Sequence, residues 1–143
     1  MKNGCWQRML RIDLANRKTR VEEIPEKDLR EFIGGVGLGA EILRRDFPKR
    51  ISPFDSRNLL IFGTGPFQGP VVSGKAKFSI TGISHQTHTY AETAAGADLG
   101  PSFKDSGYDV LVIEGVSERP VYLQIVDDRV EIKDTTYLWD WIH

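Results

Sequence analysis

The 143-residue sequence predicts an α+β fold: a β-rich domain of hairpins and mixed sheets with two or three short helices. Three observations support this class. Apolar and polar residues alternate at the period of a strand over most of the chain. Gly, Pro, Asn and Asp separate these segments at hairpin spacing, and only a few short segments show a helical period. At this length we expect one domain over residues 1–143.

Composition and charge exclude several classes of partner. The formal net charge of −1 gives no electrostatic case for binding nucleic acid or an anionic membrane surface, both of which require a basic face. No apolar run is long enough to span a bilayer, and the N-terminus has no signal-peptide core. A cytoplasmic location is therefore predicted. The single cysteine, Cys5, cannot form an internal disulfide, and it cannot hold an iron–sulfur cluster or a structural zinc alone.

The chain is expected to begin with a β-hairpin. Residues 10–14 alternate as a half-buried strand, with Arg11 on the polar face, and residues 19–24 form the second strand. Asn16, in the loop between them, suits a left-handed conformation. Pro25 then fits the first position of a helix, since its fixed φ is helical and its missing N–H is not needed there.

Glycines mark the next two helices. Gly34-Gly35 ends the first helix, and a second helix follows before Pro48. The apolar side of this second helix consists of Leu38, Ile42 and Leu43. Gly35-x-Gly37-x-x-Ala40 also matches a relaxed dinucleotide-binding fingerprint. That fingerprint has meaning only directly after a strand, and here a helix precedes it, so a glycine-mediated helix–helix turn is favoured.

The second half of the chain is predicted to consist mostly of strands. Residues 59–62 and 110–113 are apolar runs typical of strands buried on both faces. Residues 75–81 alternate, and residues 121–126 and 129–133 form a hairpin. The polar face of 75–81 consists of Lys75, Lys77, Ser79 and Thr81. A short helix starts at Gly100-Pro101, and Asp134-Thr135-Thr136 cap a last helix over residues 137–143. Since the sequence stops within that helix, its C-terminal end is expected to be incomplete.

The stretch Ser73–Tyr108 combines features of a ligand-approach surface. Its small residues 93–97 would let a ligand approach the backbone. Lys77 could face an anion, although solvated lysines on an exposed sheet face are commoner. His85 and His88 have a spacing that suits metal on a helix, but they lie in a predicted loop without a third ligand. The remaining polar candidates, Ser84, Thr87, Thr89, Glu92, Thr93 and Asp98, show no decisive spacing. The residues by themselves leave the ligand open.

Five strings, taken in order, resemble the N-terminal domain of the aldehyde ferredoxin oxidoreductase family. They are EFIGGVGLGAEIL, NLLIFGTGPFQG, KFSITGIS, AAGADLGPSFKDSGYDVLVIEG and RPVYLQI. The resemblance implies part of an enzyme with a tungsten or molybdenum bis-pterin, which oxidises aldehydes to carboxylic acids. It also implies that electrons pass through a [4Fe–4S] cluster to ferredoxin. The family's cluster cysteines and substrate pocket belong to later domains, so this chain is expected to hold no cluster and to be inactive alone.

The resemblance further implies which residues contact the cofactor. The family's basic residue beside the pterin and its phosphates falls on Lys77, where Arg is usual; Lys keeps the charge but loses the planar fork. The family's Asn-Ser-Gly segment falls on Ala94, Ala95 and Gly96. The backbone carbonyl of Ala94 is the implied magnesium ligand, because a main-chain oxygen does not depend on the side chain.

Departures from the family's pattern support an alternative. Val36 and Lys77 each replace a usual Arg, Ala94 replaces Asn, and Asp98 stands in the usual Gly-Tyr-Phe-Gly segment. The alternative is a non-catalytic binding or assembly subunit that keeps the fold without the cofactor. A small-molecule-binding β-domain unrelated to the family is a third interpretation. The expected partners are the missing C-terminal domains or a separate subunit, ferredoxin for the complete enzyme, and a second copy at an unpaired sheet edge.

Overall fold

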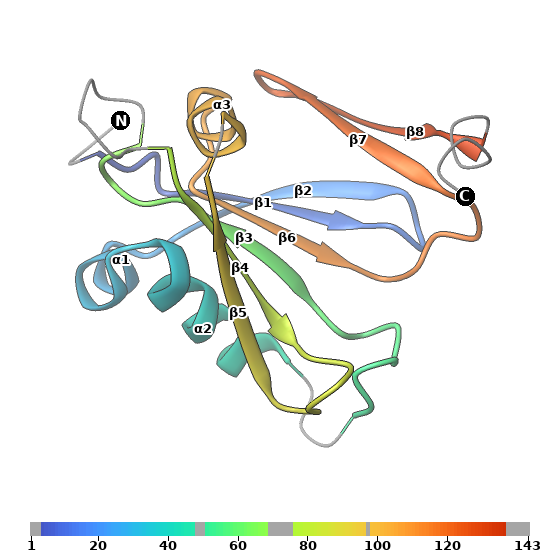
Figure 1. Ribbon diagram of the computed structural model, residues 1–143. Coiled ribbons are helices and arrows are strands. Elements are labelled where there is room, and N and C mark those ends of the chain that lie inside the picture. The colour runs from blue at the N-terminus through green and yellow to red at the C-terminus, as the bar shows by residue number, and fades with distance from the viewer. Residues whose placement is uncertain (1–3, 48–50, 69–75, 97, 137–143) are drawn as a thin grey trace.

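The computed structural model describes residues 4–47, 51–68, 76–96 and 98–136. These residues contain eight strands and three helices (Figure 1). The strands are β1 (Arg8–Asp13), β2 (Lys18–Glu23), β3 (Leu60–Gly63), β4 (Phe78–Ile83), β5 (Tyr90–Ala95), β6 (Val110–Glu114), β7 (Val121–Val126) and β8 (Arg129–Asp134). The helices are α1 (Glu26–Phe32), α2 (Gly35–Asp46) and α3 (Leu99–Asp105). This content confirms the predicted α+β class.

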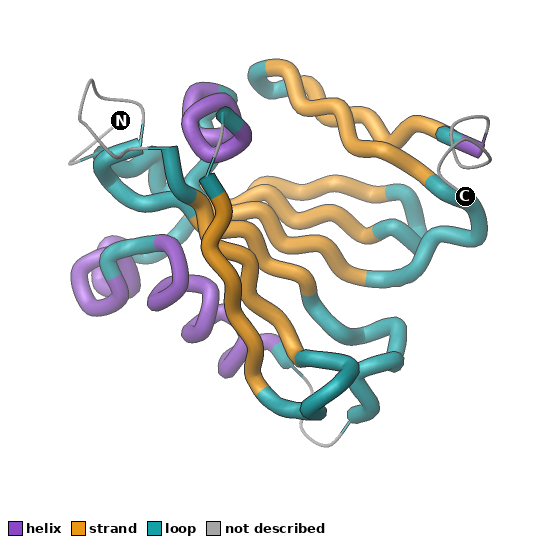
Figure 2. The backbone as a smooth tube through the Cα atoms, in the orientation of Figure 1, coloured by secondary structure: helices purple, strands orange, loops and turns teal. Residues whose placement is uncertain are grey.

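Six of these strands form one sheet in the order β2-β1-β6-β3-β4-β5. The hairpins β1–β2 and β4–β5 lie at its two edges, and β6 enters between β1 and β3. All neighbouring pairs are antiparallel except β1–β6, where parallel pairing places Met9 opposite Val110. The β7–β8 hairpin is a separate two-stranded sheet (Figure 2).

Two layers cover opposite faces of the six-stranded sheet (Figure 1). Helices α1 and α2 pack on one face over a buried cluster of Met9, Ile24, Leu38, Ile42, Leu43, Leu59, Ile61, Val110 and Val112. On the other face, α3 and the β7–β8 hairpin pack over Leu10, Ile12, Phe103, Tyr108 and Leu111. Strands β1 and β6 are therefore covered from both sides, as expected for the apolar run at 110–113.

Glycines let α2 approach both α1 and the sheet. A Cβ atom at Gly37 would lie 2.6 Å from the carbonyl oxygen of Phe32, and one at Gly39 would lie 2.8 Å from Oγ1 of Thr81 on β4. Only glycine fits such contacts. Because α1 directly precedes this segment, the structure confirms the helix–helix turn and rules out the strand context of a dinucleotide fingerprint.

Three local features differ from the prediction. Pro25 is the N-cap residue of α1 rather than its first helical residue. Helix α1 is closed by Ile33, with φ of +65°, before the glycine pair begins. In the β1–β2 loop Arg17, not Asn16, has the positive φ of +51°. Asn16 is held by two hydrogen bonds to the Asp13 carboxylate, from its backbone N at 3.0 Å and its Nδ2 at 2.7 Å, so the left-handed residue is the next one.

Burial also differs from the strand patterns. Leu60 on β3 is 43% exposed, so the apolar run at 59–62 is not covered on both faces. Ser79 and Thr81 on β4 are buried although they belong to the predicted polar face. The reason is that this face packs against α2, whose glycines leave room for small polar side chains. Arg11 is buried as well, because acidic side chains from three other elements surround it.

The C-terminal prediction is tested in part. Strands β7 and β8 form the predicted hairpin, with Asp127 at its turn (φ +51°). Oδ1 of Asp134 accepts a hydrogen bond from the backbone N of Thr136 at 2.9 Å, as in a helix cap. The helix predicted over residues 137–143 lies outside the described residues. None of the described helices is long and apolar enough to cross a membrane.

Candidate functional site

The β4–β5 hairpin brings the implied cofactor-binding residues to one end of the sheet. Phe78, the first residue of β4, pairs with Ala95, the last residue of β5. Lys77 and Gly96 adjoin this pair, one before β4 and the other after β5. We call the four residues Lys77, Ala94, Ala95 and Gly96 the hairpin-end surface.

Lys77 is exposed, and two contacts hold its backbone. The Nε2 atom of Gln68 donates a hydrogen bond to the Lys77 carbonyl oxygen. Gly100, in the first turn of α3, packs over the same peptide, since a Cβ atom there would lie 3.4 Å from the carbonyl carbon and oxygen of Lys77. The main chain of Lys77 is thus fixed while its side chain stays accessible. Lys75, the other lysine of the predicted polar face, lies outside the described residues.

The hairpin-end surface fits an anionic group held by backbone atoms. Strand β5 lies at the sheet edge, so along one side its N–H and C=O groups face no other described strand. Ala94 and Gly96 are exposed and Ala95 is half-buried, so no bulky side chain of the described residues covers these groups. Main-chain N–H groups and an ammonium suit phosphate oxygens, and a main-chain carbonyl suits magnesium. These residues therefore fit a phosphorylated cofactor with magnesium.

The His- and Thr-rich residues 84–89 lie at the opposite end of the hairpin. The six residues of β4 separate this turn from Lys77, a distance of about 20 Å at about 3.3 Å per residue. His85 packs against Phe54 with its ring tilted by 37° and the ring centroids 4.6 Å apart. No group of three or more potential metal ligands occurs in the part of the chain that the structure describes. His85 and His88 therefore find no third ligand there, and the described residues of the stretch 73–108 do not form a single surface.

Two of the other polar candidates of that stretch, Ser84 and Glu92, have local roles. Oγ of Ser84 accepts hydrogen bonds from the backbone N of Gln86 and of Thr87, both at 3.2 Å, which close the turn. The Glu92 carboxylate accepts a hydrogen bond from the Tyr90 hydroxyl at 2.9 Å. Asp98, in contrast, is the exposed N-cap residue of α3, near the hairpin-end surface.

A buried ion pair beneath α3 was not predicted. Nζ of Lys104 contacts Oδ1 of Asp109, and the two side chains are 1% and 2% exposed. Oδ2 of Asp109 also accepts hydrogen bonds from the backbone N of Gln7 at 2.6 Å and of Arg8 at 3.4 Å. The pair fixes α3, and with it Gly100, against the N-terminal segment. Lysine is almost never fully buried, so the sequence held no signal for this role.

Cys5 lies close to this pair and is buried. Burial raises the pKa of its thiol, while Lys104 acts in the opposite direction. A thiol with a raised pKa is a weak nucleophile and a weak metal ligand. Its environment is thus that of a packing residue.

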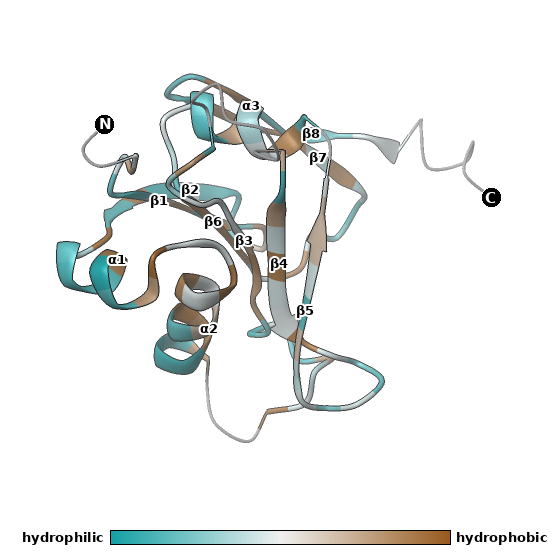
Figure 3. Ribbon diagram, turned by 60° about the vertical axis from the view of Figure 1, so that its left-hand side comes forward, coloured by the Kyte–Doolittle hydropathy of each residue, from teal (hydrophilic) through white to brown (hydrophobic). Residues whose placement is uncertain are grey.

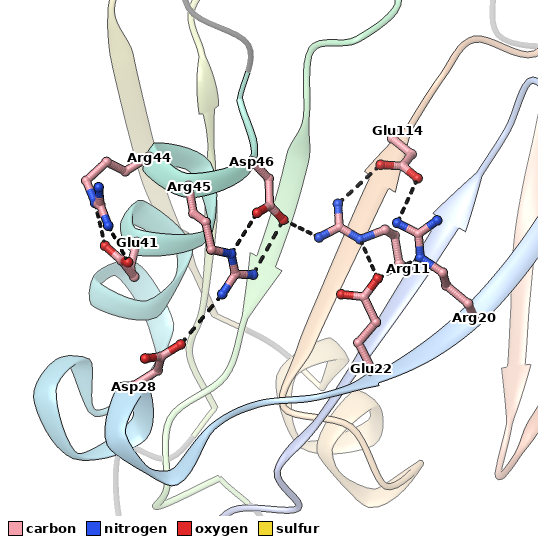
Figure 4. Close-up of polar contacts among 9 residues, drawn as sticks. All are labelled: Arg11, Arg20, Glu22, Asp28, Glu41, Arg44, Arg45, Asp46 and Glu114. Atoms are coloured by element: carbon pink, nitrogen blue, oxygen red, sulfur yellow. Dashed lines mark hydrogen bonds and ion pairs between the residues drawn. The ribbon is translucent and has the colours of Figure 1, made fainter.

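Arg11 is the centre of a charge network that joins β1, β2, β6 and α2 (Figure 4). Its guanidinium lies 3.2 Å from Glu22, 3.2 Å from Glu114, and in contact with Asp46 at the end of α2. Burial disfavours the charged form of Asp46, but hydrogen bonds from Arg45 and Arg11 outweigh it and hold the pKa of this carboxyl below its ordinary value. Because arginines occupy these carboxylates, the network is structural.

An apolar groove of about 570 Å³ opens on the sheet face opposite α2. Its walls include Leu60, Ile80, Thr93 and Ile113, with Phe54 and His85 at one side. The β7–β8 hairpin packs against the face formed by β1 and β6, and in Figure 3 it lies above β4 and β5. The sheet face at β3, β4 and β5 is thus more open than the face at β1 and β6.

The fold and the hairpin-end surface define a β-rich domain whose edge fits a phosphorylated ligand. The family model described as "Aldehyde ferredoxin oxidoreductase, N-terminal domain" matches residues 9–142. The chain belongs to this family and corresponds to its N-terminal domain.

Three known proteins illustrate the similarity. The tungsten-containing aldehyde ferredoxin oxidoreductase of Thermococcus kodakarensis is 34% identical over 95% of this chain and 22% of that protein. The WOR-like subunit of the aliphatic sulfonate oxidoreductase of Pyrococcus furiosus is 35% identical, over 92% of this chain and 21% of its own length. The active-site complex BamBC of benzoyl coenzyme A reductase with 1,5-dienoyl-CoA matches with a TM-score of 0.93 and 32% identity. That match covers 96% of this chain and 21% of the solved chain, so the chain spans about a fifth of these relatives.

Proposed function

We propose that this chain is the tungstopterin-binding domain of an aldehyde ferredoxin oxidoreductase-like enzyme, and that the hairpin-end surface holds the cofactor. The observation that carries the proposal is the adjacency of Lys77 and Ala94–Gly96 at the end of one strand pair. In this arrangement the Lys77 ammonium balances the charge of the pterin phosphates. The backbone of Ala94–Gly96 binds these phosphates, and the Ala94 carbonyl oxygen is a ligand of their magnesium ion.

The relatives support the nature of the group. The Thermococcus protein is described as tungsten-containing, and a bis-pterin with tungsten, or molybdenum in its place, would supply the redox chemistry that converts an aldehyde to a carboxylic acid. The residues of this chain bind and orient the group. We propose that the chain is inactive alone, because we assign the [4Fe–4S] cluster and the substrate pocket to further domains or to a separate subunit. The relatives, which are more than four times as long, have room for these parts. Ferredoxin is the proposed electron acceptor, and the cytoplasm the proposed location.

A chimeric enzyme tests this proposal. The chain replaces the matching N-terminal fifth of the Thermococcus enzyme, and tungsten per polypeptide is measured by mass spectrometry after purification. We expect Lys77→Glu and Gly96→Val to lower the tungsten content at least about tenfold, since a repelled phosphate or a blocked approach removes several charge-assisted contacts. A Cβ atom at Gly96 would meet only the Ala76 carbonyl oxygen, at an ordinary 3.7 Å, so Gly96→Val is expected to fold.

Lys18→Glu is the matched control, because Lys18 is an exposed lysine on the far edge strand β2. It makes the same charge change and should leave the tungsten content unaltered. Unchanged tungsten after Lys77→Glu and Gly96→Val would contradict the assigned roles. A folded chimera that contains no tungsten even with the unmodified chain would instead favour an assembly subunit. The exposed carboxylate of Asp98 near the hairpin-end surface supports this alternative, because it would repel a phosphate.

A further inference from the structure

We infer that Gln68 is a positioning residue for the hairpin-end surface, because it fixes the peptide that carries Lys77. The inference rests on the proposed function and adds a residue that the family resemblance does not assign. Gln68 follows β3 and is 6% exposed, which is unusual for a glutamine in a loop. Such burial requires a specific set of hydrogen bonds.

The amide group of Gln68 is oriented by its neighbours. The carbonyl oxygen of Lys77 can only accept a hydrogen bond, so the NH₂ end of the Gln68 amide faces it. The backbone N of Gln68 donates to the Gly65 carbonyl at 3.3 Å, which fixes the start of the side chain. The loop after β3 is thereby tied to the residue that precedes β4.

The other end of the amide has no donor in the part of the chain that the structure describes. Oε1 of Gln68 is buried and lacks a hydrogen-bond partner among the described residues. It lies 3.3 Å from the position that a Cβ atom of Gly100 would take, beneath the first turn of α3. A buried acceptor without a donor lowers stability, and an apolar side chain of similar length would avoid that loss. Stability alone therefore does not explain a glutamine at this position. The hydrogen bond to the Lys77 carbonyl does explain it.

The consequence concerns the Lys77–Phe78 peptide. Gln68 holds its carbonyl by a hydrogen bond, and Gly100 packs against both the Gln68 amide and this carbonyl. This peptide adjoins Ala95 and Gly96 across the hairpin end. Without Gln68 the peptide can rotate, and the Lys77 side chain then no longer starts from a fixed main-chain position beside the backbone of Ala94–Gly96.

Gln68→Met is the main variant, because methionine keeps the length of the side chain and donates no hydrogen bond. Two measurements are made on the purified chain: amide hydrogen exchange by NMR, and titration with Mg²⁺ and pyrophosphate as a probe for the phosphate-binding surface. We expect exchange at Phe78 and Gly100 to become about tenfold faster. We expect the pyrophosphate dissociation constant to rise about five- to tenfold, as for the loss of one positioning hydrogen bond, with a nearly unchanged urea midpoint.

Two variants check the interpretation. Gln86→Met makes the same change at an exposed glutamine in the distant 84–89 turn and should alter neither measurement. Gly100→Ala disturbs the same peptide from the α3 side, since its Cβ atom would lie at the 3.3–3.4 Å contacts. It should also speed amide hydrogen exchange at Phe78. If Gln68→Met does not fold, Gly100→Ala can be used in its place to test the inference.

The outcomes separate this inference from the proposed function. If Lys77→Met leaves pyrophosphate binding unchanged, the phosphate role of Lys77 fails, while exchange at Phe78 still decides whether Gln68 fixes the peptide. Unchanged exchange after Gln68→Met overturns the inference. Faster exchange with unchanged pyrophosphate binding, in a chain where Lys77→Met does weaken binding, also overturns it. When Lys77→Met is combined with Gln68→Met, the second change should weaken binding no further, because it acts through Lys77.

Discussion

The Lys104–Asp109 pair shows how much can depend on one residue. Both side chains are almost fully buried, and Asp109 also accepts two backbone hydrogen bonds. Removal of one partner of a buried pair leaves the other charge uncompensated, and this costs more than the net contribution of the intact pair. The position of α3 over the Lys77 peptide therefore depends on a lysine that does not belong to the hairpin-end surface.

Lys104→Met is expected to lower the free energy of unfolding by about 3 kcal/mol, because it leaves the buried Asp109 carboxylate without its charged partner. Urea denaturation followed by circular dichroism measures the change. Lys18→Met removes an exposed lysine and should cost less than about 0.5 kcal/mol. A loss below about 1 kcal/mol for Lys104→Met would show that the backbone donors alone satisfy Asp109.

The sequence could predict some of these residues and not others. Lys77 and Ala94–Gly96 were assigned through family resemblance, and the structure brings them together at one hairpin end. Gln68 and Lys104 could not be assigned, because their roles depend on burial by elements distant in the sequence. His85 and His88 suggested a metal site through their spacing, but spacing does not show that the turn lies far from the other candidates.

At the scale of elements, the network around Arg11 ties α2 to the sheet. Asp46 ends α2 and contacts Arg11 on β1, and Glu22 and Glu114 extend the contact to β2 and β6. The end of a helix carries unpaired carbonyl groups and frays readily. A buried guanidinium near this end therefore fixes the last turn of α2 on the sheet.

This network predicts a pH dependence of stability. The pKa of Asp46 is lowered in the folded chain, so its contribution is present above the unfolded pKa and is lost as pH falls through the folded one. We expect Asp46→Asn to lower the free energy of unfolding by about 1–3 kcal/mol at pH 7. The difference from the parent chain should start to shrink below about pH 4, where Asp46 of the unfolded chain becomes protonated, and it should disappear below the lower pKa of Asp46 in the folded chain.

Urea unfolding at several pH values measures this difference. Asp105→Asn, at an exposed carboxylate on α3, is the control and should shift stability by less than about 0.5 kcal/mol at any pH. A difference for Asp46→Asn that stays constant from neutral to acidic pH would contradict the ionic role.

Element prediction succeeded where the determinants are local. The hairpins β1–β2, β4–β5 and β7–β8 follow from alternation and turn residues that lie close together in sequence. Burial does not follow from the local sequence, because it depends on which face α2 covers. The exposed Leu60 and the buried Ser79, Thr81 and Arg11 are examples. The parallel β1–β6 pairing leaves no local signal at all, since its two strands come from opposite ends of the chain.

At the scale of the whole molecule, the two sheet edges differ in charge. Strand β2, with the sequence KTRVEE, presents four charged residues, whereas β5, with YAETAA, presents one. Charged edges resist pairing with other strands, and weakly charged ones invite it. The open apolar groove lies next to the weakly charged edge, so we expect the isolated chain to self-associate on this side.

Light scattering coupled to size-exclusion chromatography tests this expectation over a wide range of concentration. Leu60→Lys, in the groove, should shift the mass toward that of the monomer. Val21→Lys is the control, because Val21 on β2 is similarly exposed, 48% against 43% for Leu60. A monomer at high concentration, or an equal effect of both variants, would count against association through the groove side.

The position of β6 also determines when this sheet can form. The two edge hairpins need only nearby residues and can form within microseconds, but neither can join the other until β6 is present. About 100 residues separate Met9 from its partner Val110, and a ribosome adds about 5–20 residues per second. The first hairpin therefore waits about 5–20 s during synthesis before its neighbour in the sheet exists. During that time the apolar side of β1 lacks its native neighbour, so nascent chains of this domain depend on chaperones at the ribosome to protect this surface.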